Sequence, residues 1–236
     1  MRSEDARREI LSAIRENLKP RGIAPGSAVG STGSADPGPA TEGPQSPRKS
    51  FRAARGSKER GDVVSSFTER LAAVGAQCSV VRGEAEAAGA LAGILSGAGA
   101  RRVVGSDAPL VQRLLRPLRD RFEMAALDRL SRDDLFACDV GVTTAQWGIA
   151  ETGTLVLESA RERSRLLSLV PPIHVALLST RCICESLGDG LAHVRQADSH
   201  AITFITGPSR TSDIELTLVV GVHGPQTVHV LLLEDL

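Results

Sequence analysis

The sequence predicts an α/β domain with a mostly parallel sheet flanked by helices. Two observations favour this fold class. From about residue 58 onward, short apolar runs alternate with helical patterns, which is the order typical of parallel sheets. The apolar residues are mainly aliphatic, with five Phe, one Trp and no Tyr, a composition that suits buried parallel strands covered by helices. After a low-complexity stretch is set aside, the 236-residue chain fits one domain of ordinary size.

The first half of this region alternates regularly between helix and strand. Gly75 marks the end of the first helical pattern, because glycine commonly follows the last turn of a helix. Helices are predicted over residues 62–76, 84–100, 108–118 and 131–138, and strands over residues 77–81, 101–106 and 121–125. These elements follow one another as successive β–α–β units.

The second half contains more polar turns between its apolar runs. Strands are predicted over residues 140–144, 154–158, 171–179, 201–206 and 227–233, and a helix over residues 181–195. The segment after residue 206 predicts a loop that leads into another helix, because Ser212 and Glu215 have the spacing of a capping box.

The N-terminal quarter has a different composition. Residues 1–19 predict an amphipathic helix, with Ser3 as N-cap and an apolar stripe formed by Ala6, Ile10, Ile14 and Leu18. Residues 20–50 contain six Pro and six Gly, so residues 20–55 predict a flexible linker. The α/β domain is then expected to span residues 56–236.

Charge gives little support for nucleic acid or anionic membrane as a partner, because the formal net charge is zero. Residues 1–60 nevertheless carry 12 basic and 7 acidic residues, whereas residues 61–236 carry 16 and 21. A basic tail on an acidic body is compatible with a partner surface or with a homo-oligomer, but ordinary solvated charge is the favoured explanation. No apolar stretch reaches the roughly 18–20 residues that a membrane span needs.

Cysteine and histidine spacing argues against a metal site. The four cysteines form no CxxC pair, and the spacing in RCICES suits neither zinc nor an iron–sulfur cluster. The five histidines form no HExxH or HxH motif. The N-terminus also lacks the apolar region of a signal peptide. The sequence therefore predicts a cytoplasmic protein with reduced thiols and no metal.

One candidate ligand site lies in TGPSRTSDIELTLVVGVHGP, residues 206–225. Loops at the carboxyl ends of parallel strands commonly bind ligands, and a helix N-terminus there offers free N–H groups to an anion. Arg210 can add a bidentate contact to a phosphate or carboxylate. The candidate residues are Ser209, Arg210, Thr211, Asp213 and His223. The alternative is a capped helix in which Arg210 pairs with Asp213 or Glu215, and spacing alone leaves both open.

A second candidate lies in GVTTAQWGIAETGTLVLES, residues 141–159. Glu151 is expected on a tight turn before a strand, where a carboxylate can act as base or nucleophile. The candidate residues are Thr143, Thr144, Gln146, Glu151, Gly153 and Thr154. The alternative is a structural turn in which Trp147 fills the core. His174, within an apolar strand, is expected to be a hydrogen-bonded core residue.

These two segments, together with VPPIHVALL, resemble the LUD-domain family. The resemblance covers roughly residues 55–236 and is strongest from Asp139 onward. It implies the fold shared by ribose-phosphate isomerases, glucosamine-phosphate deaminases and CoA transferases, the NagB/RpiA/CoA-transferase-like fold. It also implies a role in the oxidation of L-lactate to pyruvate, beside two partner subunits that carry the iron–sulfur clusters. No cofactor is then expected on this chain.

Three functions follow as hypotheses. The first is a cluster-free, ligand-binding subunit of a lactate-oxidising complex, in which Arg210 holds a small anion. The second is a self-sufficient enzyme of the CoA-transferase or phosphosugar-isomerase type. By analogy with the Glu-x-Gly turn of such transferases, Glu151 would then be the catalytic carboxylate. The third is a structural or regulatory interaction module.

Overall fold

The computed structural model describes residues 59–162, 164–212, 218–220 and 224–235. The predicted amphipathic helix, residues 1–19, and the predicted linker, residues 20–55, lie outside the described residues. The α/β domain is described from Glu59 onward.

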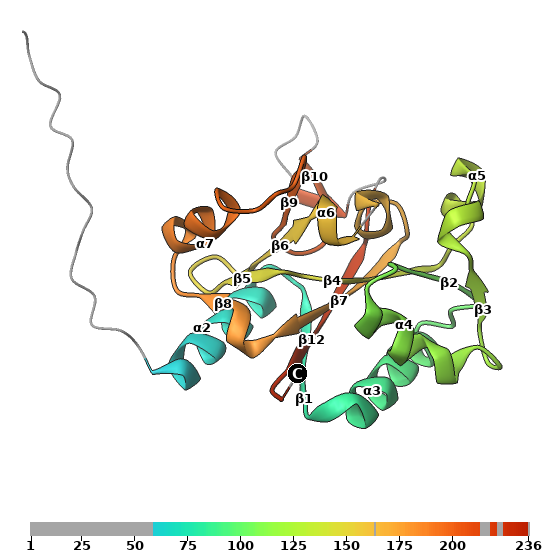
Figure 1. Cartoon of the computed structure of the whole chain (residues 1–236), viewed down its shortest axis with the longest axis horizontal. Helices are drawn as coiled ribbons and strands as arrows, with labels where there is room; N and C mark the ends of the chain where they lie inside the picture. The colour runs from blue at the N-terminus through green and yellow to red at the C-terminus, as the bar shows by residue number, and fades with distance from the viewer. Residues whose placement is uncertain (1–58, 163, 213–217, 221–223, 236) are drawn as a thin grey trace, which may run out of the picture. The chain divides into compact units, whose positions relative to one another are not determined.

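Six parallel strands form the central sheet (Figure 1). All of its neighbouring strands pair in parallel, which confirms the predicted fold class. In sheet order the strands are β1 (Gln77–Val81), β12 (Thr227–Leu233), β7 (Ile173–Ser179), β4 (Val140–Thr144), β2 (Arg102–Gly105) and β3 (Glu123–Ala125). The chain moves outward from β2 to β3 and then returns to β4 on the other side of β2, so the strand order reverses between β2 and β4.

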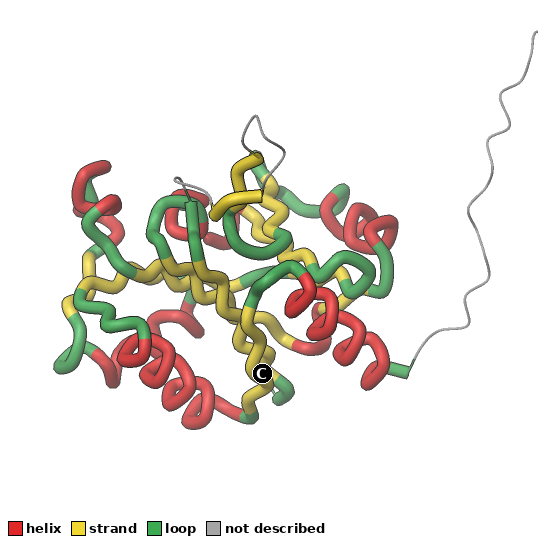
Figure 2. The backbone as a smooth tube through the Cα atoms, turned by 180° about the vertical axis from the view of Figure 1, so that it is seen from behind, coloured by secondary structure: helices red, strands yellow, loops and turns green. Residues whose placement is uncertain are grey.

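Different elements cover the two faces of the central sheet. One face packs on helices α3 (Gly83–Gly97) and α4 (Pro109–Leu115) through side chains such as Leu91 and Leu114. The other packs on helix α2 (Arg60–Ala73), in which Phe67 is completely buried, and on a second, smaller sheet. Figure 2 shows the same layers from behind. Successive residues of a strand point to opposite faces of the sheet. Because both faces are covered, the inner strands appear in the sequence as continuous apolar runs.

The smaller sheet has four strands and is mostly antiparallel. Its order is β8 (Ile183–Cys184), β5 (Trp147–Ile149), β6 (Thr154–Glu158) and β9 (Ile202–Ile205). The predicted strand at residues 201–206 therefore exists, but it pairs antiparallel with β6 and not with a parallel strand. Strand β5 is not predicted by the sequence, because its three residues lie between polar turns and show no alternation.

Two predicted helices are wrong in part. The helix expected over residues 181–195 begins only at α7 (Leu187–Val194), because Ser186 and Asp189 form a capping box there and the preceding residues pair with β5. The helix expected to start at Ser212 is replaced by a hairpin of β10 (Arg210–Ser212) and β11 (Leu218–Val220). Glu215, the other half of that expected cap, lies outside the described residues.

Short helices connect the remaining strands. They are η1 (Arg116–Leu118), η2 (Leu127–Arg129), α5 (Arg132–Phe136), α6 (Ser159–Glu162), η3 (Arg165–Ser168) and η4 (Thr180–Cys182). α6 follows β6 directly, so it stands where the smaller sheet meets the carboxyl end of β4.

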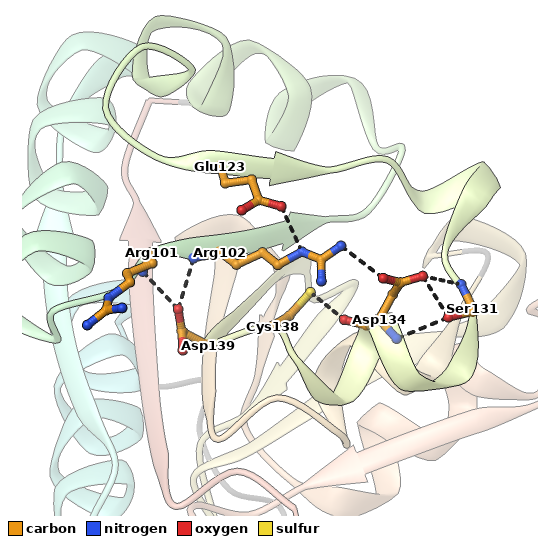
Figure 3. A network of polar contacts seen from close by, with 7 residues as sticks. All are labelled: Arg101, Arg102, Glu123, Ser131, Asp134, Cys138 and Asp139. Carbon is orange, nitrogen blue, oxygen red and sulfur yellow. Dashed lines mark hydrogen bonds and ion pairs between the residues drawn. The ribbon is translucent and has the colours of Figure 1, made fainter.

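A polar network fastens the amino edge of the central sheet (Figure 3). The Arg102 guanidinium pairs with Glu123 at 3.0 Å and with Asp134 at 3.1 Å. A carboxylate oxygen of Asp139 accepts the backbone N–H groups of Arg101 and Arg102 at 2.8 and 2.9 Å. Because these contacts join β2, β3, α5 and the start of β4, they hold the strands in register at the edge opposite their carboxyl ends.

Candidate functional site

A cleft of about 460 Å³ opens at the carboxyl ends of β4, β7 and β12. The start of α4 and the smaller sheet complete its walls. Its polar or ionisable lining residues are Thr144, Gln146, Trp147, Glu158, Arg161, Ser179 and Cys182. In open parallel sheets, ligands bind outside the carboxyl ends of the strands, near the point where the strand order reverses. The cleft lies beside that point here, since β4 and the loop after β2 both contribute to it.

A larger hollow of about 700 Å³ lies against β2, β3 and the end of α4. Its charged lining residues, among them Asp107, Arg119 and Asp128, are all exposed to solvent. Buried polar groups fix the orientation of a ligand better than mobile surface charges do. We therefore take the smaller cleft, which has such groups, as the candidate site.

Glu162 is the centre of the polar network beside the cleft. Its side chain is 2% exposed, and its carboxylate accepts hydrogen bonds from the backbone N–H and the hydroxyl of Thr144. The side-chain amide of Gln146 donates to the same carboxylate at 3.1 Å, while its oxygen accepts the backbone N–H of Glu158 at 2.6 Å. Gln146 therefore couples the end of β4 to the end of β6.

Burial determines the acidity of Glu162. Loss of solvent raises the pKa of its carboxyl, and hydrogen bonds from Thr144 and Gln146 oppose that rise only in part. The Ser106 hydroxyl is also fully buried and makes no hydrogen bond of normal geometry within the described part of the chain.

Two opposite charges line the cleft without pairing. Glu158 is 9% exposed, and its carboxylate has no hydrogen bond or ion pair with any residue that the structure describes. Arg161, one helical turn further along, lines the same cleft and likewise has no ion pair in the described ranges. The Glu158 residue is largely buried, but its carboxylate oxygens are not among the enclosed unpaired atoms of the described residues and line the cleft. Because neither side chain is paired within the described part of the protein, both charges are available to a molecule in the cleft.

Of the residues predicted around β4, Thr144 and Gln146 lie in the cleft. Thr143 is completely buried on the opposite face of its strand, with its hydroxyl 2.8 Å from Nε2 of His174. Complete burial lowers the pKa of His174 to about 4, so the imidazole is neutral near pH 7. The interpretation of His174 as a hydrogen-bonded core residue is confirmed.

The turn that carries Glu151 lies elsewhere. The Glu151 carboxylate accepts the backbone N–H of Leu187 at 3.0 Å, at the first turn of α7, and Glu151 does not line the cleft. Gly153 approaches helix α2 closely, because a Cβ atom there would lie 2.6 Å from the backbone nitrogen of Leu71. The hydroxyl of Thr154 contacts that of Thr206 at 2.7 Å. The structure thus separates Glu151, Gly153 and Thr154 from Thr144 and Gln146.

Ser209 and Arg210 do not line the cleft either. The Arg210 guanidinium donates to the backbone carbonyl of Val74 at 2.9 Å, just after the last turn of α2. Ser209 donates its backbone N–H to the carbonyl of Pro225 at 2.7 Å. Thr211 belongs to β10, while Asp213 and His223 lie outside the described residues. This part of the chain therefore caps α2 with Arg210.

Neither a metal site nor a membrane span is found in the described part of the chain. Its residues contain no group of three or more His, Cys, Asp or Glu side chains arranged to hold a metal ion. The described cysteines are free thiols, and burial raises the pKa of Cys78 and Cys184 to about 11. None of the described helices has the length and apolar character needed to cross a bilayer.

Comparison with protein families gives one match over most of the chain, to the LUD domain at residues 64–233. The chain belongs to the LUD domain family. The match includes the whole cleft and all six strands of the central sheet. The family resemblance drawn from the sequence is thereby confirmed.

Curated relatives of this LUD domain come from several bacteria. A lactate utilization protein C of Deinococcus radiodurans is 33% identical over 73% of this chain and 80% of its own length. An uncharacterised protein of Neisseria meningitidis is 42% identical over 39% of this chain, and lactate utilization protein C of Bacillus subtilis is 36% identical over 41%. The matched part spans less than half of these last two proteins, at 41% and 43% of their lengths.

A solved structure supports the fold of this LUD domain. The crystal structure of a DUF162 family protein from Deinococcus radiodurans superimposes with a TM-score of 0.58 and 24% identity. The alignment covers 75% of this chain and 99% of that protein. This likeness concerns the fold alone.

Glu158, Arg161 and Glu162 are not among the site residues predicted from the sequence of the LUD domain. They stand in LVLESARER, which reads as the end of a strand followed by solvated charge. One signal is present, since Glu158 continues an uninterrupted apolar strand without a turn residue before it. A charged side chain at that position is either exposed to solvent at the strand end or buried in a functional site. Only the structure distinguishes the two.

Proposed function

We propose that this LUD domain is the cluster-free, ligand-binding component of an L-lactate utilisation system. It works beside iron–sulfur subunits that oxidise L-lactate to pyruvate. Support for lactate comes from relatives named lactate utilization protein C. Support for ligand binding comes from one observation above all, the buried Glu162 network at the carboxyl end of β4.

Burial disfavours the thiolate form of the described cysteines. Metal ligation requires thiolates, whereas burial raises the pKa of Cys78, Cys138, Cys182 and Cys184. Cys182 and Cys184, though close in sequence, belong to no larger group of metal-ligating side chains among the described residues. In the proposed complex the electron-transfer chemistry belongs to the partners, and this chain supplies a binding site.

The test combines binding and genetics. L-Lactate and pyruvate are titrated into the full chain by calorimetry, and tagged chain is used to capture the iron–sulfur subunits from cells grown on L-lactate. We expect saturable binding of at least one of the two acids, co-purification of the partners, and loss of growth on L-lactate after deletion. Normal growth of the deletion strain, without partner capture, would overturn the proposal.

The self-sufficient enzyme has less support from the geometry. Its nucleophile would be Glu151, but that carboxylate accepts a backbone N–H at the start of α7 and lies outside the cleft. If Glu151→Gln abolished an acyl-transfer or isomerase activity of the purified chain, this alternative would replace our proposal. The purely structural module predicts instead that no small acid binds at all.

A further inference from the structure

We infer that Glu158 and Arg161 are the specificity-determining pair of the cleft, and that they select a small molecule carrying a proton donor next to a carboxylate. Hydroxy acids and amino acids both have this chemistry. The inference rests on the proposed function for the location of the site, and goes beyond it in assigning which atoms of the ligand are recognised.

The first step concerns the Glu158 carboxylate. It is the last residue of β6, nine-tenths buried, and has no partner among the described residues. A carboxylate accepts hydrogen bonds and donates none when ionised. The carboxylate oxygens of Glu158 are not among the enclosed unpaired atoms of the described residues, so they are open to the cleft that the residue lines. A ligand group with O–H or N–H supplies the missing donor.

The second step concerns the Arg161 guanidinium. It lines the same cleft as Glu158 and stays unpaired with it, although the two residues are only one helical turn apart. Opposite charges that face one cleft without joining leave space for a molecule between them. A guanidinium binds a carboxylate through two parallel hydrogen bonds. The ligand therefore presents its donor to Glu158 and its carboxylate to Arg161.

The third step concerns rigidity. The backbone N–H of Glu158 donates to the side-chain oxygen of Gln146 at 2.6 Å, and Glu158 pairs with Ile202 in the smaller sheet. Gln146 is in turn held by Glu162 and Thr144. The carboxylate therefore projects from a fixed backbone position, and fixed groups discriminate between ligands better than mobile ones.

Four acids of nearly equal size separate the contributions of the two charges. L-Lactate, L-alanine, propionate and pyruvate share a three-carbon carboxylate skeleton, and their second carbon carries a hydroxyl, an ammonium, hydrogen or a carbonyl oxygen. Trp147 is the only tryptophan of the chain and lines the cleft, so its fluorescence reports binding to the full chain. Calorimetry provides an independent measurement.

We expect L-lactate or L-alanine to bind at least about tenfold more tightly than propionate and pyruvate, which is the loss expected for one hydrogen bond to a charged group. Glu158→Gln should reduce that preference to about threefold or less. Arg161→Gln should weaken all four acids by about tenfold. Glu69→Gln, at an exposed position of α2, is the matched control and should change none of these values.

The outcomes separate this inference from the proposed function. Binding of L-alanine but not L-lactate, with dependence on Glu158 and Arg161, supports the inference and argues against a lactate component. Equal binding of L-lactate and propionate overturns the inference and leaves the lactate proposal standing. Failure of all four acids to bind the wild-type chain also overturns it. Should Glu158→Gln unfold, the exposed Arg161→Gln variant alone decides, because an unchanged affinity there contradicts the inference.

Discussion

The Nε2 atom of His174 lies 2.8 Å from the hydroxyl oxygen of Thr143, and both side chains are completely buried between the central sheet and its covering layer. The second imidazole nitrogen, Nδ1, has no hydrogen-bond partner in the part of the chain that is described. A proton added to this ring would create an unsolvated charge. The pair therefore makes stability sensitive to acid.

The first prediction is a loss of stability below neutral pH that depends on His174. Its folded-state pKa of about 4 lies below the ordinary value of 6.5. As pH falls from 6.5 toward 4, the His174 imidazole binds a proton in the unfolded chain but stays neutral in the folded chain. The free energy of unfolding should drop by about 2 kcal/mol between pH 7.5 and pH 5 from this residue alone. Urea unfolding at both pH values measures it.

His174→Gln should remove that part of the pH dependence, although it lowers stability at every pH. His200, which is exposed, offers the control variant His200→Gln, for which the wild-type slope should persist. An unchanged slope in His174→Gln would contradict the assignment.

The second prediction concerns Glu162 and has the opposite sign. Its pKa is raised, mainly because its carboxyl is desolvated. The folded chain keeps this proton at a pH where the unfolded chain has lost it. The contribution to stability is thus greatest below the ordinary pKa of glutamic acid and is lost as pH rises through the folded-state pKa.

Glu162→Gln cannot ionise, so its free energy of unfolding should improve relative to the wild type as pH rises from 4 to 8. The quantity to follow is the difference between the two proteins at each pH, which cancels all other titrations. A difference that stays constant over this range would show that Glu162 titrates normally.

The third prediction concerns the amino-edge network. Arg102→Gln should lower the urea midpoint of unfolding modestly, because it breaks contacts to two exposed carboxylates that water already screens in part. The loss should shrink in 1 M NaCl. Arg101 is the matched control, since its guanidinium points away from the network in Figure 3, and Arg101→Gln should leave the midpoint unchanged. Equal effects of the two substitutions would refute the proposed role of Arg102.

The fourth prediction contrasts two glycines. Gly153 has φ of +66°, and a Cβ there would meet helix α2, so Gly153→Ala should cost about 2 kcal/mol or more. Gly93 lies exposed in the middle of α3, and a Cβ added to it would meet no neighbouring atom within 4 Å. Gly93→Ala should therefore stabilise by about 0.5–1 kcal/mol. Thermal unfolding distinguishes the two signs.

The inner strands β12, β7, β4 and β2 of the central sheet are predictable because they are mostly buried on both faces, whereas the edge strands β1 and β3 are mostly exposed or half-buried. Each of the six appears in the sequence as a short apolar run, and Gly75 correctly marks the end of the first helix. Local patterns do not show which strands pair. The strand at Ile202–Ile205 has a clear apolar run, but its antiparallel partner β6 is more than forty residues earlier in the chain, and no local signal records that contact.

The candidate site is only half predictable for the same reason. Thr144 and Gln146 stand out as polar residues at the end of an apolar strand. Glu158 and Glu162 look like ordinary surface charges until the folded chain buries them beside that strand end. Arg210 has a spacing that suits an anion site, yet the hairpin directs it to the carbonyl of Val74. Burial and long-range contacts decide these roles.

The cleft has walls from both sheets, since Thr144 and Ser179 come from the parallel sheet and Trp147 and Glu158 from the antiparallel one. A molecule bound there contacts both sheets and so links the two layers. Any compound that binds only the native chain adds to its stability, by about 2.7 kcal/mol at one hundred times its Kd. Metabolite supply would then govern how long each copy survives proteolysis, so the cellular level of the protein would follow the abundance of the molecule it holds.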